Sequence, residues 1–353
     1  MSKVDLRAKK PLIISGPCSA ETEEQLLDTC KQLAATGVVD VLRAGIWKPR
    51  TNPGGFEGVG IKGLPWLAKA KEITGLPIAI EVANGKHAQD ALEFGVDVLW
   101  VGARSTVNPF SVQEIADAVK GHDVAVLVKN PMNPDVNLWA GAVQRFRNAG
   151  IKNIGIIHRG FSAIGGYYRN NPMWHLAIEM RRRMPELPLI GDPSHICGRR
   201  DCLLEVSQKA ADLNYDGLII ESHICPDKAW SDAAQQVTPA DLETLVRSIK
   251  WRTEAVDKPE FVQALDQYRV QIDQLDSELF ELLSKRMSVA EKIGEVKRDN
   301  NVTILQSGRW GDIVDRVVSL SGKLKLSEEF LKTILEAIHI ESINRQNSIM
   351  NKE

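Results

Sequence analysis

Short apolar segments and helix-forming segments alternate through the first 250 residues, and this alternation limits the possible folds more than any other feature. Segments rich in Ala, Leu, Glu and Lys separate the apolar segments, and Pro239–Lys250 closes the series. Eight strand–helix units of this size predict an α/β fold, a (β/α)8 TIM barrel. A doubly wound open sheet is the alternative, although no GxGxxG motif follows the first strand. The predicted strands are Leu12–Ser15, Val38–Arg43, Ile78–Glu81, Val96–Val101, Val124–Lys129, Ile154–His158, Leu187–Ile190 and Gly217–Glu221.

Charge and cysteine content exclude several other classes of protein. The 353-residue chain has a formal net charge of −2, so no overall field would attract nucleic acid or an anionic membrane. No apolar run approaches the roughly 20 residues that cross a membrane, and the apolar run near the start is short for a signal peptide. Five cysteines, an odd number in a long chain, fit reduced thiols better than a disulfide framework. We therefore expect a cytoplasmic protein.

Metal-capable side chains follow the last two predicted strands, between Leu189 and Asp232. Asp192 and His195 come after the seventh strand, and Glu221 ends the eighth. Because the strands of a barrel are parallel, their carboxyl ends meet on the face where barrel enzymes place catalytic residues. An imidazole with two carboxylates suits a divalent metal, whereas His and Asp after strands also serve as turn and helix-cap residues.

The first strand is the neighbour of the eighth in a closed barrel, and it is followed by Cys18. Cys18, His195, Glu221 and Asp232 would form a mixed site that suits Mn²⁺, Fe²⁺, Co²⁺ or Zn²⁺. The alternative for Cys18 is a small buried core residue. His223 could replace His195, but it lies only two residues past Glu221, where the loop can begin.

Basic side chains follow several of the predicted strands. A single cation after a strand is usually a solvated surface residue, but six on one rim would repel one another without an anion. The planar guanidinium of Arg matches phosphate and carboxylate oxygens, and Lys supplies a point charge. We therefore expect substrates with several anionic groups. The six cations are Arg43, Lys48, Arg50, Arg104, Lys129 and Arg159.

The motifs around these residues resemble those of 3-deoxy-D-arabino-heptulosonate 7-phosphate synthases. The resemblance covers residues 10–250 in order and is to the compact type, close to 3-deoxy-D-manno-octulosonate 8-phosphate synthase. It implies a metal-dependent condensation of phosphoenolpyruvate with erythrose 4-phosphate, the first step of the shikimate pathway. The motifs are GPCSAE (16–21), LRAGIWKPRT (42–51), VGARS (101–105), VKNP (128–131), HRGF (158–161) and DPSHICGRRD (192–201).

The resemblance also implies a role for each matching residue. Cys18, His195, Glu221 and Asp232 match metal ligands, with Mn²⁺ as the expected ion and Fe²⁺, Co²⁺ or Zn²⁺ as alternatives. Lys48 is the candidate for proton transfer, and a purely electrostatic role is the alternative. The remaining matches are Arg104, Lys129 and Arg159 around the phosphoenolpyruvate phosphate, Arg43 and Lys48 near its carboxylate, and Arg50 and Thr51 on the erythrose 4-phosphate phosphate. Octulosonate synthases carry a different version of KPRT, so this segment favours the four-carbon sugar.

The segment 251–259, WRTEAVDKP, breaks the strand–helix rhythm and is interpreted as a linker between domains 1–250 and 260–353. Apolar residues beyond it recur at steps of 3 and 4, which predicts a helix of about 40 residues. Two shorter helices, near 307–320 and 327–346, are expected to follow. They cannot cover the whole long helix, so we expect a homodimer through this domain. The spaced residues are Leu265, Tyr268, Ile272, Leu275, Leu279, Leu282, Val289, Ile293 and Val296.

The repeat has one position that should be apolar and is not, and Arg286 occupies it. A buried Arg needs an anion, which is either a ligand or an interhelical ion pair, unless its head group reaches solvent. The segment resembles the all-helical type of chorismate mutase, which converts chorismate to prephenate. The departures from the family are Gln306 and Trp310, where some members carry acidic residues near the substrate hydroxyl. The matching residues are Arg286 and Lys297 for catalysis, and Arg269, Arg309, Ser342 and Gln346 for substrate binding, with Arg269 entering the partner subunit's site.

Two alternatives remain open at this point. The barrel could be an octulosonate phosphate synthase, which KPRT argues against. The helical segment could be a non-catalytic module that senses chorismate or prephenate, because binding and catalysis would use the same cations. Joining the first step to a later one in a single chain also permits feedback inhibition by prephenate.

Overall fold

The computed structural model describes residues 4–8, 10–48, 54–163, 165–253 and 256–351. The chain divides into two compact units, Met1–Glu254 and Ala255–Glu353. Each unit has its own architecture, and each is described by itself.

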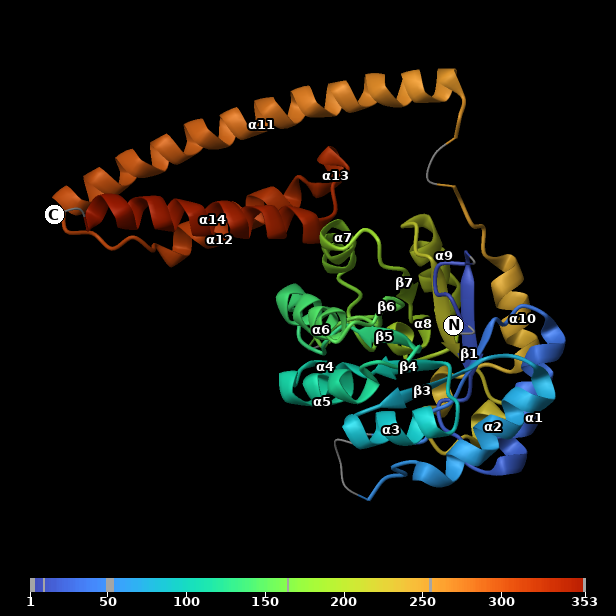
Figure 1. The fold of residues 1–353 in the computed structure, drawn as a ribbon. Helices are drawn as coiled ribbons and strands as arrows, with labels where there is room; N and C mark the ends of the chain where they lie inside the picture. Colours follow the sequence, from blue (N-terminus) through green and yellow to red (C-terminus); the bar gives the residue numbers. More distant parts are fainter. Residues whose placement is uncertain (1–3, 9, 49–53, 164, 254–255, 352–353) are drawn as a thin grey trace. The chain divides into compact units, whose positions relative to one another are not determined.

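Within the described residues of the first unit, eight parallel strands close into a barrel in which β1 pairs with both β2 and β8 (Figure 1). The predicted TIM barrel is therefore confirmed, and the open sheet is wrong. The strands are β1 (Leu12–Gly16), β2 (Val41–Arg43), β3 (Ile78–Val82), β4 (Val98–Val101), β5 (Ala125–Lys129), β6 (Ile154–His158), β7 (Leu189–Gly191) and β8 (Gly217–Glu221).

The second, fourth, fifth and seventh strands are shorter than the sequence pattern predicts, and the second and seventh show the physical reason most clearly. The second begins at Val41 because Asp40 forms part of the preceding turn, where its carboxylate accepts a hydrogen bond from the Ile13 N–H at 2.8 Å. The seventh begins at Leu189 because the Leu187 N–H bonds to the Met184 carbonyl in a turn. At these two places the hydrogen bonds of a turn outweigh the apolar composition of the segment.

Helices surround the barrel and bury their apolar faces against it (Figure 1). Caps define their ends, as in α1, where the Thr22 side chain accepts a hydrogen bond from the Gln25 N–H. The helices are α1 (Glu23–Thr36), α2 (Gly63–Thr74), α3 (Gly85–Glu93), α4 (Ala103–Thr106), α5 (Pro109–Val119), α6 (Val136–Asn148), α7 (Trp174–Arg183), α8 (Pro193–Cys197), α9 (Leu203–Asp212) and α10 (Pro239–Ser248).

The alternation of side chains along each strand produces two cores. In β1, Ile13 packs on the surrounding helices, whereas Leu12 and Ile14 fill the inside of the barrel. The Trp100 ring also lies inside, and the Arg43 guanidinium sits 4.7 Å from its centroid. The barrel interior therefore changes from apolar to charged towards the carboxyl ends of the strands.

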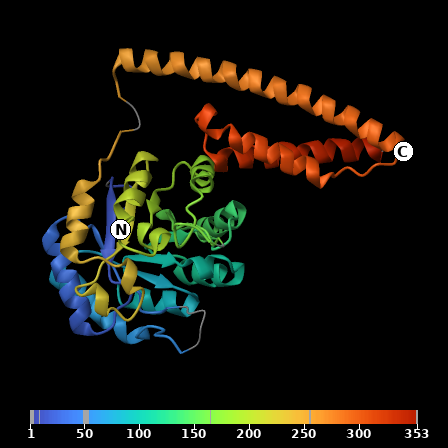
Figure 2. The ribbon, with the colours of Figure 1, turned by 180° about the vertical axis from the view of Figure 1, so that it is seen from behind.

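The second unit consists of helices α11 (Pro259–Asp299), α12 (Ser307–Ser319), α13 (Ser321–Leu324) and α14 (Glu328–Met350). Figures 1 and 2 show the long α11, in orange, running beside α14, in red. The three predicted helices are present, and the short α13 follows α12 in addition. In this chain by itself, the α11 repeat stays exposed, with Tyr268 at 64% and Leu275 at 63%. No helix in the described part of the chain is long and apolar enough to cross a membrane.

Candidate active sites

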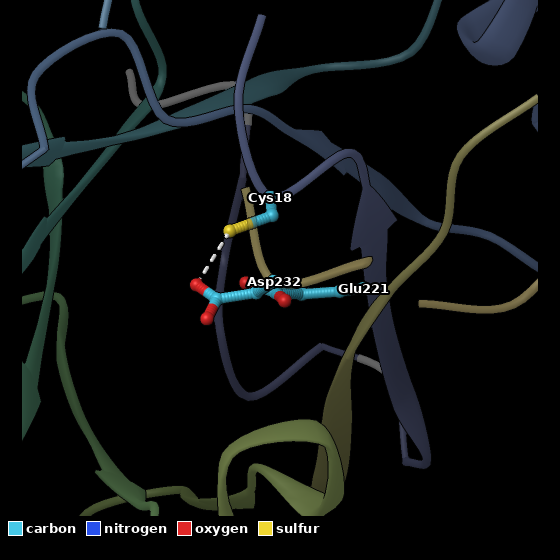
Figure 3. A group of neighbouring side chains, drawn as sticks. All are labelled: Cys18, Glu221 and Asp232. Atoms are coloured by element: carbon cyan, nitrogen blue, oxygen red, sulfur yellow. Dashed lines mark hydrogen bonds between the residues drawn. The ribbon is translucent and has the colours of Figure 1, made fainter. Parts of the chain in front are cut away.

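Cys18, Glu221 and Asp232 point towards one another at the carboxyl ends of the barrel strands (Figure 3). The Cys18 sulfur and one carboxylate oxygen from each acid all lie within 4.8 Å of one another. The arrangement follows from the barrel register, because Gly16 at the end of β1 pairs with Glu221 at the end of β8. A thiol with two carboxylates provides the donor types that borderline divalent ions accept. The residues present therefore fit a metal ion.

His195 borders this group from the short helix α8. Its Nε2 lies 3.8 Å from Glu221 Oε1, and its Nδ1 lies 2.9 Å from Asp192 Oδ2. The Asp192 carboxylate also caps α8 by accepting from the His195 backbone N–H, so Asp192 has the cap role. A carboxylate on Nδ1 fixes the ring of a metal-binding His and turns Nε2 towards the ion. His223 instead faces Glu21, at 3.4 Å between Nε2 and Oε2.

Lys48 and Arg43 supply positive charge next to the group. Lys48 Nζ lies 2.8 Å from the Cys18 sulfur, and Arg43 Nη1 lies 3.2 Å from Glu221 Oε1. Burial raises the pKa of the Cys18 thiol to about 12, and Glu221 adds to this effect. Burial would lower the pKa of Lys48, but Cys18 and Glu221 outweigh it and raise that pKa. Lys48 is therefore a cation at neutral pH, which suits a charge or a proton donor better than a base.

The two acids of the group remain carboxylates. Burial would raise the pKa of Glu221, but His195 and Arg43 hold it below its usual range. Burial would likewise raise the pKa of Asp232, but Lys48 and Arg169 hold it well below its usual range. Both side chains therefore keep the charge that a metal ligand needs.

Next to this group, a cavity of about 80 Å³ collects most of the predicted cations. Lys129 Nζ bonds to Asp192 Oδ2 at 2.8 Å, and Arg159 Nη1 donates to Asn170 Oδ1 at 2.8 Å. Burial lowers the pKa of Arg159 to about 10, so the side chain keeps its charge at neutral pH. The lining residues are Lys48, Glu81, Gly102, Ala103, Arg104, Lys129, Arg159, Arg169, His195 and Asp232. Arg50 and Thr51 lie outside the described residues.

Sequence reasoning missed Arg169 at this cavity. It lies in the loop between β6 and α7, well beyond the end of its strand, where a search for residues directly after strands does not reach. Its Nη1 donates to Asp232 Oδ1 at 3.1 Å and to Gln235 Oε1 at 2.6 Å. The path of a long loop decides such contacts, and the strand pattern does not encode that path.

A second pocket, of about 410 Å³, lies between α11, α12 and α14. Arg286 Nη1 donates to Ser342 Oγ at 2.6 Å, and Lys297 Nζ donates to the Ile304 carbonyl. Gln346 Oε1 is buried and has no hydrogen-bond partner among the described residues. The lining residues are Arg286, Val289, Ala290, Ile293, Lys297, Ile304, Gln306, Trp310, Ile313, His339, Ser342 and Gln346.

Three further residues concern this pocket, two that the sequence predicted for it and one that it did not. The predicted Arg269 does not line it in this chain; its Nη1 lies 3.1 Å from Asp266 Oδ1 on the same helix. Arg309 lies in α12, and its side chain is outside the described part of the structure. His339, which the sequence did not single out, stacks on Trp310 with ring centroids 4.1 Å apart.

Comparison with known proteins identifies a family for each unit. The DAHP synthetase I family pattern matches residues 7–258, and the chorismate mutase type II pattern matches residues 268–347. Phospho-2-dehydro-3-deoxyheptonate aldolase of Thermotoga maritima is 31% identical over 244 residues, covering 69% of this chain and 70% of that protein. 2-Dehydro-3-deoxyphosphooctonate aldolase of a Synechococcus species is 28% identical over 276 residues, covering 70% and 90%.

A solved structure agrees with this assignment. The crystal structure of the Thermotoga maritima phospho-2-dehydro-3-deoxyheptonate aldolase superimposes with a TM-score of 0.61 at 31% identity, covering 67% of each chain. The chain therefore belongs to the DAHP synthetase I family, and it joins a synthase barrel of that family to a chorismate mutase type II domain.

Proposed function

We propose that the barrel condenses phosphoenolpyruvate with erythrose 4-phosphate, giving 3-deoxy-D-arabino-heptulosonate 7-phosphate and phosphate, in a metal-dependent reaction. The observation that carries the proposal is the group of Cys18, Glu221 and Asp232 beside a cavity rich in cations. With His195 as the fourth ligand, the group would hold a divalent ion, Mn²⁺ first and Fe²⁺, Co²⁺ or Zn²⁺ as alternatives. Such an ion, when bound, polarises the aldehyde oxygen as a Lewis acid.

The chain's own cations would bind and orient the two anionic substrates. Arg104, Lys129 and Arg159 surround the place proposed for the phosphoenolpyruvate phosphate, where they offset its charge. Carbon 3 of phosphoenolpyruvate then attacks the aldehyde carbon, water adds at carbon 2, and the phosphate leaves. Lys48 is the candidate for donating a proton in this sequence, and Arg43 is proposed to lie near the substrate carboxylate. Holding both substrates in line lowers the entropic part of the barrier.

Parallel assays with two sugars test the proposal. Phosphoenolpyruvate consumption is followed with metal-loaded full-length protein and either erythrose 4-phosphate or arabinose 5-phosphate. We expect turnover with the four-carbon sugar, because the KPRT segment, with Arg50 and Thr51, is proposed to clamp its phosphate. Preference for the five-carbon sugar would instead favour the octulosonate synthase alternative.

We also propose that the helical unit converts chorismate to prephenate. The supporting observation is the pocket in which Arg286 and Lys297 project from one face of α11 opposite Ser342 and Gln346 of α14. The rearrangement is pericyclic and needs no base or nucleophile. The pocket would hold the folded substrate and place cations where charge develops on the ether oxygen.

The mutase proposal is tested with Arg286→Ala in the full-length protein. We expect chorismate consumption to fall roughly 10²-fold or more, because one cation facing the developing charge is lost. The synthase rate of the same sample is the control for folding. Tight chorismate binding by the unaltered protein without turnover would favour the alternative of a non-catalytic sensing module.

Dimerisation and feedback extend the same proposal. The exposed apolar repeat of α11 would pair with a second copy, so that the Arg269 of each chain completes the other's pocket. Prephenate bound in the helical pocket would then inhibit the barrel. Synthase assays with added prephenate test this idea by comparing the unaltered protein with Arg286→Ala. An equal response in both proteins, or none, would contradict the feedback proposal.

A further inference from the structure

Arg169 and Gln235 connect two of the proposed metal ligands through hydrogen bonds. Arg169 Nη1 donates to Asp232 Oδ1 at 3.1 Å and to Gln235 Oε1 at 2.6 Å. Gln235 Nε2 in turn donates to Glu221 Oε2 at 2.7 Å. Gln235 is buried, whereas the Arg169 side chain is half exposed at the cavity. The pair therefore bridges Asp232 in the loop after β8 and Glu221 at the end of that strand.

The charges around Gln235 permit one orientation of its amide. The Arg169 guanidinium only donates hydrogen bonds, so it fixes the amide oxygen on its own side. The amide nitrogen must then face the Glu221 carboxylate, which only accepts. A flipped amide would place an oxygen against Glu221 and an N–H group against Arg169, losing both bonds. Arg169 thus determines how Gln235 holds Glu221.

Each of the two ligands is held on both of its carboxylate oxygens. Glu221 Oε1 receives Arg43 Nη1 at 3.2 Å, while Oε2 receives the amide of Gln235. Asp232 Oδ1 receives Arg169, while Oδ2 receives the Cys18 thiol at 3.2 Å. Arg169 and Gln235 each hold one of these oxygens, Asp232 Oδ1 and Glu221 Oε2, and thereby fix the direction of the second oxygen of the same carboxylate.

The backbone at Asp232 adds a reason for such support. Its φ of 46° lies in the left-handed region, which is unfavourable for a residue other than glycine. The surrounding loop holds this conformation, because Ser231 Oγ lies 2.6 Å from Ser19 Oγ and the Gln235 N–H bonds to the Asp232 carbonyl. A residue held in this way depends on its neighbours for the direction of its side chain.

We propose that Arg169 and Gln235 are positioning residues that set the Glu221 and Asp232 carboxylates for the divalent ion before it binds. This inference rests on the proposed metal site. Groups that orient metal ligands typically contribute 10–100-fold in metal affinity, as a rough range. Neither residue needs to touch the ion.

The test is a titration of metal-free full-length protein with Co²⁺, followed by the thiolate-to-cobalt absorption band of Cys18. Gln235→Met has similar length and no hydrogen-bonding amide, and it leaves the charge unchanged. We expect it to weaken Co²⁺ binding roughly 10–100-fold. Arg169→Met should weaken binding as well, with Arg169→Lys intermediate. In the double variant, the two losses should not multiply, because both variants break one chain of bonds.

The Co²⁺ affinity of Arg169→Met also distinguishes a positioning effect from a simple effect of charge. Removing a cation near a metal site should strengthen binding of a divalent cation by Coulomb's law, so a weaker affinity in Arg169→Met points to positioning. Arg199→Met is the matched control, because Arg199 packs on the Tyr167 ring and pairs with Asp201, and neither of these residues is a proposed metal ligand. Its Co²⁺ affinity should stay within about twofold of the unaltered protein, a small change on the scale of these effects.

Two results would overturn the inference, and they distinguish a failure of positioning from a failure of the metal site itself. If the unaltered protein binds Co²⁺ with the thiolate band and Gln235→Met and Arg169→Met bind as tightly, positioning fails while the metal site stands. If the unaltered protein shows no thiolate band, or if Cys18→Ser keeps it, the proposed metal site fails as well. Thermal unfolding of each metal-free variant identifies any that does not fold, and the half-exposed Arg169 then provides the second test.

Discussion

The Lys48 ammonium lies 2.8 Å from the Cys18 sulfur and 3.1 Å from the Cys18 carbonyl oxygen. One side chain thus donates to both the backbone and the thiol of a proposed metal ligand. The same ammonium lines the cavity that is proposed to receive phosphoenolpyruvate. Lys48 therefore lies between the group of Cys18, Glu221 and Asp232 and this cavity, where its charge would act on both a bound ion and a bound substrate.

Replacing Lys48 with Ala should lower the synthase kcat/KM by roughly 10²–10⁴-fold, because both charge and a proton donor are lost. Lys48→Arg should recover at least about tenfold of that loss, because it restores the charge. Phosphoenolpyruvate consumption measures the effect, and chorismate consumption by the same samples controls for folding. A kcat/KM within a few-fold of the unaltered protein in Lys48→Ala would exclude a role in the reaction.

Ser342→Ala should weaken the mutase reaction. The substitution removes the hydroxyl that accepts from Arg286 Nη1 at 2.6 Å, so the guanidinium loses its partner on α14. A hydrogen bond to a charged group contributes about 1.5–3 kcal/mol, which corresponds to roughly 10–100-fold in kcat/KM. Steady-state chorismate consumption measures the change. Ser288→Ala, on the same helix as Arg286 but absent from the pocket lining, is the matched control and should change little.

The proposed dimer predicts a separate effect on assembly. Leu275 and Leu279 are 63% and 50% exposed along α11 in the single chain. Introducing Asp at both positions would place charge in an apolar helix contact, which should dissociate the dimer. Sedimentation velocity should show a dimer for the unaltered protein and a smaller species for the variant, with mutase activity lost. A monomeric unaltered protein with full mutase activity would contradict this arrangement.

Acid should destabilise the barrel through His158. Its Nε2 donates to the Pro172 carbonyl at 2.6 Å, and its Nδ1 accepts from the Tyr215 hydroxyl at 2.9 Å, so the neutral ring satisfies both partners. Burial lowers the pKa of His158 to about 4. The unfolded chain takes up this proton near pH 6.5, so the unfolded state binds more protons between about pH 6.5 and 4. The contribution of the neutral His158 to the free energy of unfolding is therefore fully present above this window and is lost as the pH falls through it.

Between about pH 7 and 5, this one residue should cost about 2 kcal/mol of unfolding free energy. Denaturant unfolding of the protein and of His158→Gln at the two pH values measures the difference. The variant should be less stable at neutral pH, because it loses the paired contacts, but its loss on acidification should be about 2 kcal/mol smaller. The same pH dependence in both proteins would assign acid sensitivity to other groups.

The barrel could be predicted because strand spacing and composition record it directly. Cys18 and Glu221 were brought together by topology alone, since a closed barrel makes the first and last strands neighbours. The cations Lys129 and Arg159 were found in the same way, because each stands at or directly after the end of a strand.

Residues in long loops and on helix faces could not be found by that reasoning. Arg169 and Gln235 contact Asp232 and Glu221 from the segments after β6 and β8, and the paths of these segments depend on tertiary contacts. His339 enters the helical pocket by stacking on Trp310, a contact between two helices that periodicity alone does not specify. Asp192 shows the converse case, because its place after a strand suggested a ligand, whereas it caps α8 and pairs with Lys129.

The most direct test of the account is the metal dependence of phosphoenolpyruvate consumption with erythrose 4-phosphate. Full-length protein stripped by a chelator should be inactive and should recover on addition of Mn²⁺, whereas Cys18→Ser and Glu221→Gln should not recover. Chorismate consumption should be the same before and after stripping in every sample. Full synthase activity in protein shown by elemental analysis to be metal-free would contradict the proposed site of Cys18, His195, Glu221 and Asp232.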